Sequence, residues 1–205
     1  ENNLVVHREG SWDWPDWGSK ADMTAIENAW VYYALSSVEE MAAVLGVEDD
    51  LTFIAERKER IKSGYQSLWT KKGFKSKGKL KPDDRANALA VLAGLAEEWQ
   101  YDTIVNVLTS TKNSSPYMEY YVLEALCKLG RYDEAIELYN HYFDVMYSGN
   151  IEYKKLIDEI YEKYKNGIDV YLECYCAPLR CHGDIIKEKL QKRLIKERIK
   201  MYKQV

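Results

Sequence analysis

Hydrophobic side chains recur at steps of three and four residues along most of the chain, which predicts amphipathic helices. The first series begins after Asp22 and ends at Leu45, with the small polar Ser37 as its one exception. Gly46 then stops the helix. A second series covers residues 51–68. No alternating pattern predicts a β-strand, so the sequence predicts an all-α protein.

The third predicted helix differs from its neighbours because it is apolar on several faces. It reads "RANALAVLAGLAEEW" and follows Pro82 and the pair Asp83–Asp84. A helix that is apolar all round is usually enclosed by other helices. A lysine-rich loop, "TKKGFKSKGKLKP", separates it from the first two helices.

Further helices are predicted near residues 101–108 and within "NSSPYMEYYVLEALCKLG" and "RYDEAIELYNHYFDVMY". In the middle one, Ser115 is the predicted N-cap, Pro116 the first helical residue and Gly130 the terminator. Three helical hairpins thus precede Ser148, and their more apolar helices alternate with more charged ones. Such alternation indicates an inner ring of helices wrapped by an outer ring.

The composition changes at Asn150. Residues 150–205 carry 13 basic and 9 acidic side chains, whereas residues 1–149 carry 16 and 24. We therefore predict two parts: three hairpins with their preceding loop over residues 1–149, and a diverged helical tail over residues 150–205. The tail ends in a basic amphipathic helix, which suits either an acidic membrane or calmodulin-like partner, or packing on its own domain. We favour packing.

The totals restrict the partners. A net charge of −4 disfavours nucleic acid as the main partner, because phosphate binding needs a basic surface. No apolar run is long enough to span a bilayer, and no export signal is recognisable at the start, so no membrane contact is expected. Cys174, Cys176, Cys181 and His182 form a C-x-C-x4-C-H cluster without the usual zinc spacing. We interpret these cysteines as free thiols and predict no metal and no cofactor.

The stretch "SWDWPDWGSKAD", residues 11–22, contains three tryptophans and three aspartates. Trp is costly to expose and Asp is costly to bury unpaired, so their mixture needs an explanation. A sugar-binding surface explains it, because indoles stack on a ring and carboxylates accept bonds from hydroxyls. A structural loop whose indoles fill a core is the alternative.

Two known architectures compete for the hairpins. "LGRYDEAIELY", residues 129–139, resembles the turn of a tetratricopeptide repeat, which implies a helical interaction module without chemistry. Comparable turns place Asp50, Asp102 and Asp133 at separations of 52 and 31 residues. A repeat of about 34 residues is required, so the period fails.

The second resemblance covers residues 10–149. "WDWPDWG", "DDRANALAVLAGLA" and "SPYMEYYVLEALCKLGRYDEAIELY" occur in the same order in α-L-rhamnosidases of glycoside hydrolase family 78 and their relatives, which they resemble. The resemblance implies an (α/α)6 barrel of six hairpins and inverting hydrolysis of terminal α-L-rhamnosides. Three hairpins correspond to part of such a toroid.

In such a barrel the N-termini of the inner helices share one mouth, so three loop segments should converge there. The converging residues would be Trp12, Asp13, Trp14, Asp16, Trp17, Asp83, Asp84, Arg85, Tyr117 and Glu119. We predict that a rhamnoside is bound by Asp13, Trp14, Asp16, Trp17, Asp84, Arg85 and Glu119. The alternative makes Asp83 and Asp84 helix caps and Trp12 a core residue.

Inversion needs a carboxylic acid and a carboxylate base about 6.5–9.5 Å apart. The family's acid lies in an Arg-Asp-Glu-Arg block upstream of the tryptophan loop, and residues 1–10 contain no such block. In the family the base lies in a Trp-Glu segment shortly after the sixth helix. Glu152 is near that place, but no Trp precedes it. We therefore expect the chain to be inactive alone. We also expect that its open barrel edge self-associates, or that the tail from Asn150 folds over that edge. Three hypotheses stay open: a hydrolase fragment, a degenerate descendant, and a helical interaction module.

Overall fold

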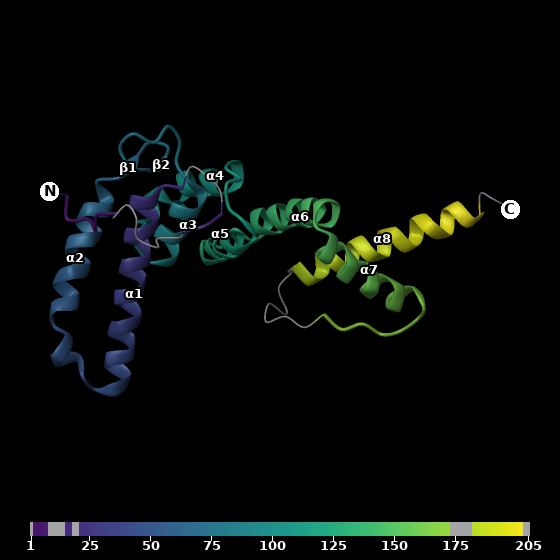
Figure 1. The fold of residues 1–205 in the computed structure, drawn as a ribbon, viewed down its shortest axis with the longest axis horizontal. Helices are drawn as coiled ribbons and strands as arrows, with labels where there is room; N and C mark the ends of the chain where they lie inside the picture. Colours follow the sequence, from purple (N-terminus) through teal and green to yellow (C-terminus); the bar gives the residue numbers. More distant parts are fainter. Residues whose placement is uncertain (1, 8–14, 18–20, 173–181, 203–205) are drawn as a thin grey trace. The chain divides into compact units, whose positions relative to one another are not determined.

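The computed structural model describes residues 2–7, 15–17, 21–172 and 182–202 (Figure 1). These residues are mainly helical and contain only two short strands, which confirms the predicted all-α class. The elements are α1 (Met23–Leu45), a 3-10 turn (Glu48–Leu51), α2 (Phe53–Gln66), β1 (Trp69–Thr70), β2 (Gly73–Phe74), α3 (Asp84–Leu92), a second 3-10 turn (Glu98–Gln100), α4 (Tyr101–Ser110), α5 (Pro116–Lys128), α6 (Tyr132–Gly149), α7 (Ile151–Lys165) and α8 (His182–Tyr202).

The chain forms two compact units, Glu1–Arg131 and Tyr132–Val205. The first contains α1 to α5 and the second contains α6 to α8. The division lies one helix before residue 149, where the composition changes. Of the predicted hairpins, α1 with α2 and α3 with α4 pack as pairs, whereas α6 packs with α7 and α8.

Helix α3 is the centre of the first unit. Every residue from Asp84 to Leu92 is buried, and the helix packs against α1, α4 and α5. Its alanines allow the neighbouring helices to approach closely, which explains why its sequence is apolar on several faces. The prediction that this helix is enclosed is therefore confirmed.

Several predicted helix ends are also confirmed. Gly46 and Gly130 adopt left-handed backbone conformations at φ 69° and 72° and end their helices. Asp22 caps α1 by accepting a hydrogen bond from the backbone N–H of Ala25. Ser115 has the extended backbone of an N-cap, and Pro116 is the first residue of α5.

A short β-hairpin lies in the lysine-rich loop, where no strand was predicted. Trp69 pairs with Phe74 and Thr70 pairs with Gly73 in an antiparallel register. The buried amide of Asn87, on α3, accepts a hydrogen bond from the Phe74 N–H and donates one to its carbonyl oxygen. Because this support comes from a distant helix, the local pattern could not reveal the strands.

The second unit has a core of its own. Phe143 on α6, Ile157 and Tyr161 on α7, and Leu190 on α8 form a buried cluster. The guanidinium of Arg193 lies 3.8 Å from the centroid of the Tyr161 ring. Helix α8 thus lays its apolar stripe on α6 and α7, as an ordinary terminal helix does. Among the residues that the structure describes, no helix is both long and apolar enough to cross a bilayer.

Gly73 gives a test of how tightly the hairpin is held against α3 and α4. Its φ is +118°, and a Cβ atom there would lie 2.9 Å from Val107 and 3.0 Å from Asn87. We expect Gly73→Ala to reduce the free energy of unfolding by about 2 kcal/mol or more, through backbone strain and crowding together. Urea unfolding followed by tryptophan fluorescence measures this, since all six tryptophans precede residue 100.

Gly78 is the matched control. It also has a positive φ, +89°, but a Cβ atom there would meet nothing within 4 Å. Gly78→Ala should therefore cost only the backbone term, about 1 kcal/mol. Equal losses at both glycines would contradict the proposed crowding.

Candidate functional site

The loops before the inner helices converge through a buried acidic side chain, Asp16. Its carboxylate accepts hydrogen bonds from the Arg85 guanidinium at 3.2 Å and from the Ser115 backbone N–H at 2.9 Å. The Ser115 hydroxyl also donates to it. Asp16 therefore connects its own segment, residues 15–17, to the starts of α3 and α5, and we call the place where these segments meet the mouth.

Arg85 is the only cation buried in this arrangement among the described residues, and it holds two carboxylates. Its Nε and Nη2 donate to Asp83 at 2.9 and 2.8 Å, while Nη1 donates to Asp16. Asp83 also caps α3 by accepting from the Arg85 backbone N–H at 3.0 Å. A planar guanidinium is required for this geometry, because its donors diverge in fixed directions.

Asp22 extends the arrangement to α1. Its backbone N–H donates to Asp83 at 3.1 Å, and its carboxylate accepts from the backbone and the hydroxyl of Ser76. We call Asp16, Asp22, Asp83 and Arg85 the polar clamp. All four are buried, so each charge depends on its partners.

Asp84 lies beside the clamp but outside it. Its Oδ2 accepts hydrogen bonds from the backbone N–H groups of Asn113 and Ser114 and from the Ser114 hydroxyl. Its Oδ1 is buried and has no hydrogen-bond partner among the residues that the structure describes. Burial, and then the charge of Asp83, raise the pKa of Asp84, although the bonds from residues 113 and 114 oppose this.

Glu119, in the first turn of α5, is the second carboxyl at this mouth. Partial burial, followed by the charge of Asp84, raises its pKa to about 7, and Lys112 opposes this. The two groups therefore interact electrostatically, and Glu119 exchanges its proton close to neutral pH. Such shifts are common in binding and catalytic sites.

An aromatic surface on α1 and α5 accompanies these carboxyls. The ring of Trp30 contacts Tyr121 edge-on at a centroid distance of 5.1 Å and stacks with Tyr33 at 6.2 Å. Tyr117 and Tyr120 pack around Tyr121, and both are exposed. Sequence analysis singled out only Tyr117, although the tyrosine-rich "PYMEYY" was a usable signal.

The remaining predicted residues fall in different places. Trp17 is 64% exposed, and its backbone N–H donates to Asp16. Trp12, Asp13 and Trp14 lie outside the described residues. Glu152 is exposed in the first turn of α7, in the second unit. The substrate contacts predicted for all of these side chains remain predictions.

In the part of the chain that the structure describes, no group of three or more His, Cys, Asp or Glu side chains is placed to hold a metal ion. Cys174, Cys176 and Cys181 lie outside that part. Cys127 is a free cysteine in an exposed residue position. Partial burial of its thiol, and then the charge of Glu124, raise its pKa.

Replacing Arg85 tests the polar clamp. In Arg85→Lys the charge remains, but one ammonium group cannot bridge Asp83 and Asp16 with the same donors. We expect a loss of at least about 2 kcal/mol in the free energy of unfolding, because buried carboxylates lose hydrogen bonds. Arg60→Lys, at an exposed pair with Glu56, should change it by less than about 0.5 kcal/mol. Similar losses for both variants would refute the clamp.

The raised pKa of Glu119 predicts that the stability of the folded chain depends on pH. Its pKa is higher in the folded than in the unfolded chain, so the folded state binds the extra proton between about pH 4.5 and 7. Stability from this group is therefore lost as the pH rises through that window. Glu119→Gln should melt roughly 3 °C above the parent chain at pH 8, with no gain at pH 4.

The exposed Glu124 on the same helix supplies the control. Glu124→Gln should raise the melting temperature at pH 8 by less than Glu119→Gln does. A pH-independent effect of Glu119→Gln would show that its carboxyl is not perturbed.

Comparison with known families gives two matches. Residues 2–142 match the bacterial alpha-L-rhamnosidase 6 hairpin glycosidase domain. Residues 96–192 match a domain of unknown function, DUF4326, over less than half of the chain. No curated protein and no solved structure gives a match. Because the first match covers more than half of the 205 residues, the chain belongs to the family of bacterial α-L-rhamnosidase six-hairpin glycosidase domains.

Proposed function

We propose that this glycosidase-like chain binds a terminal α-L-rhamnoside at the mouth formed by α1, α3 and α5, and that by itself it does not hydrolyse the glycosidic bond. Membership of the glycosidase family supports a carbohydrate ligand. Asp84 and Glu119 are the polar groups that would receive the sugar, with the exposed aromatic rings beside them.

The unpartnered Oδ1 of Asp84 carries this proposal. The side chain is 1% exposed, and a buried carboxylate oxygen without a donor is costly. A sugar hydroxyl is a donor of suitable size, and its hydrogen bond would repay part of that cost. Glu119 can accept a bond when ionised or donate one when protonated, and its pKa of about 7 makes both forms available.

The aromatic side chains suit the other face of a pyranose. Tyr117, Tyr120 and Trp17 are all exposed, and their rings provide flat apolar surfaces with a polar tip. The 6-deoxy sugar rhamnose carries a methyl group that such surfaces accommodate. The contacts of Asp16, by contrast, are with Arg85, Ser115 and its own neighbour, which supports a role in positioning the mouth.

Hydrolysis would require a carboxylic acid and a carboxylate base on opposite faces of the sugar. An inverting enzyme holds these two groups about 6.5–9.5 Å apart, which leaves room for the water that the base activates. The family's Arg-Asp-Glu-Arg block does not occur in this sequence. Glu152 lacks the flanking residues expected of the base, so we assign no catalytic role to it.

Ligand-observed NMR with methyl α-L-rhamnoside tests the binding. Stacking with two or three hydroxyl bonds should give a dissociation constant of roughly 1 mM. In Asp84→Asn the amide oxygen should take the donors of residues 113 and 114, which leaves an NH2 group, unable to accept a hydroxyl hydrogen bond, at the orphan position. The variant should therefore abolish the saturation-transfer signal. The variant should fold, because it removes a buried charge next to Asp83. Glu124→Gln should leave the signal unchanged.

A continuous assay with an aryl α-L-rhamnoside tests the inactivity. We expect no turnover above the uncatalysed rate, since loss of general acid help alone costs about 10²–10⁴-fold. Turnover that is abolished by Glu119→Gln or Glu152→Gln would contradict this and identify a catalytic carboxyl. An unchanged NMR signal in Asp84→Asn would instead refute the proposed sugar contact.

A further inference from the structure

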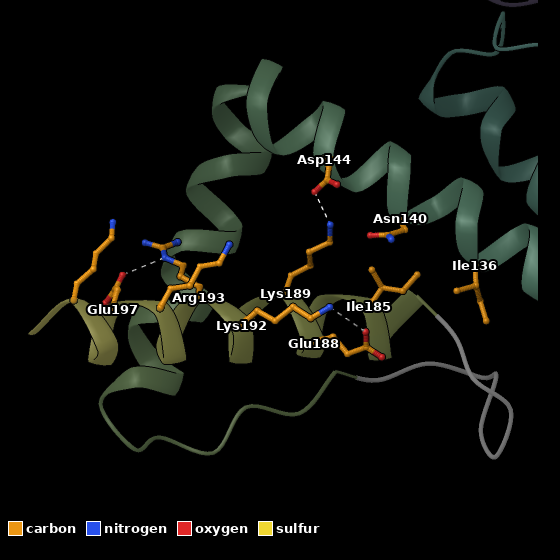
Figure 2. Close-up of a pocket in the computed structure, with 11 residues that line it drawn as sticks. Ile136, Asn140, Asp144, Ile185, Glu188, Lys189, Lys192, Arg193 and Glu197 are labelled. Carbon is orange, nitrogen blue, oxygen red and sulfur yellow. Dashed lines mark hydrogen bonds and ion pairs between the residues drawn. The ribbon is translucent and has the colours of Figure 1, made fainter. Parts of the chain in front are cut away.

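A groove of about 510 Å³ lies between α6 and α8 in the second unit (Figure 2). Its volume is in the range of small-molecule sites. Both helices belong to the unit Tyr132–Val205 and share its core, so the groove is formed within one compact body. It is distinct from the carboxyl site, whose residues all lie in the first unit.

Cations dominate the α8 side of the groove. Five of its lining residues are basic: Lys189, Lys192, Arg193, Lys196 and Lys200. Apart from the adjacent pair Lys192 and Arg193, they recur at steps of three and four residues, so they lie toward one side of the helix. Three carboxylates also line the groove: Asp144, Glu188 and Glu197.

The carboxylates are already engaged. Asp144 pairs with Lys189 at 2.6 Å, and Glu197 is shared between Lys165 at 2.9 Å and Arg193 at 3.5 Å. Glu188 approaches Lys192 only to 3.9 Å. Figure 2 shows the pairs of Asp144 with Lys189, of Glu188 with Lys192 and of Glu197 with Arg193.

Lys196 and Lys200 are left without an anion. No carboxylate among the described residues pairs with either of them, and Lys192 has only its long contact. Residues 192, 196 and 200 are one helical turn apart, about 6 Å along the axis. Their ammonium groups can therefore converge on an anion that presents charge over more than one turn.

The other end of the groove is less polar. Ile185 is 3% exposed and Ile136 is partly buried, and both line the groove next to the exposed amide of Asn140. In Figure 2 these three side chains gather at one end, while Arg193 and Glu197 lie toward the other. An occupant should consequently have an anionic part and an uncharged organic part with polar edges.

We propose that this groove binds a small diphosphate ester, with the diphosphate held by Lys192, Lys196 and Lys200 and the organic part lying on Ile136 and Ile185 near Asn140. A diphosphate presents charge on two adjacent groups and so engages more than one lysine, whereas a single phosphate engages fewer. The Asn140 amide offers both a donor and an acceptor to the organic part.

Two macromolecular ligands fit less well. Among the described residues no aromatic side chain lines the groove, so the bases of a single nucleic acid strand would find no stacking platform there. A membrane requires a broad apolar helix face. Ile186, Leu190 and Leu194 pack into the core of the unit, which leaves Ile195, Ile199 and Met201 as the exposed large apolar residues of α8. Both remain outcomes of the experiment.

Isothermal titration of the full chain with ADP tests the proposal, with AMP and sodium pyrophosphate as further titrants. We expect saturable binding of ADP and of pyrophosphate that weakens with added salt, and binding of AMP at least about tenfold weaker than that of ADP. The double variant Lys196→Gln/Lys200→Gln should weaken ADP binding about tenfold or more. Asn140→Ala should weaken ADP binding but leave pyrophosphate binding unchanged, which separates the ester from the free anion.

The double variant Lys155→Gln/Lys163→Gln is the matched control, since it removes the same charge from exposed positions of α7 that do not line the groove. It should change ADP affinity by less than about twofold. Absence of saturable ADP binding, or equal weakening in the control, overturns the proposal. Lysine-dependent binding of oligo-uridylate or of phosphatidylserine vesicles without binding of ADP also overturns it. None of these outcomes bears on the proposed binding of methyl α-L-rhamnoside, which the NMR experiment tests separately.

Discussion

The first unit depends on one buried guanidinium. Arg85 holds Asp83 and Asp16, and through them it connects the start of α3 to the tryptophan loop, to α1 and to the Ser115 turn before α5. Asp83 and Asp16 could not both be buried here without it, because each buried carboxylate needs compensation. The convergence of the helix N-termini is therefore an electrostatic arrangement as much as a packing arrangement.

That arrangement also explains why Asp84 is left incomplete. The neighbouring Asp83 takes the cap position and the Arg85 side chain, so Asp84 receives only the backbone and hydroxyl donors of residues 113 and 114, all on one oxygen. The clamp holds the loops rigidly around the second oxygen and supplies it with no donor. A buried unsatisfied group in a native structure needs an explanation, and a functional role is one of them. The charge of Asp84 also raises the pKa of Glu119, so the pKa of Glu119 depends on the ionisation state of Asp84.

The helices could be predicted because their signals are local. Gly46 and Gly130 mark the ends of α1 and α5, and Pro116 marks the start of α5. The apolar, alanine-rich sequence of α3 predicts that this helix is buried. The partners of the polar residues could not be predicted, because they are distant in sequence. The Ser115 hydroxyl, expected to cap α5, donates to Asp16 from 99 residues away. Likewise, Asp84 resembles an ordinary first-turn acidic residue, and only the folded chain reveals its unpartnered oxygen.

At α6 the boundary of the family match differs from the boundary of the compact unit, because the whole helix belongs to the second unit. The glycosidase match ends at residue 142, within α6, and the match to the domain of unknown function runs from residue 96 to 192. The last turns of α6, after the glycosidase match, contribute Phe143, whose ring stacks with Tyr147 and joins the core with α7 and α8. The earlier turns contribute Ile136 and Asn140 to the cationic groove. A helix inherited with the glycosidase pattern thus serves a second core, so a function of the second unit need not be a carbohydrate function.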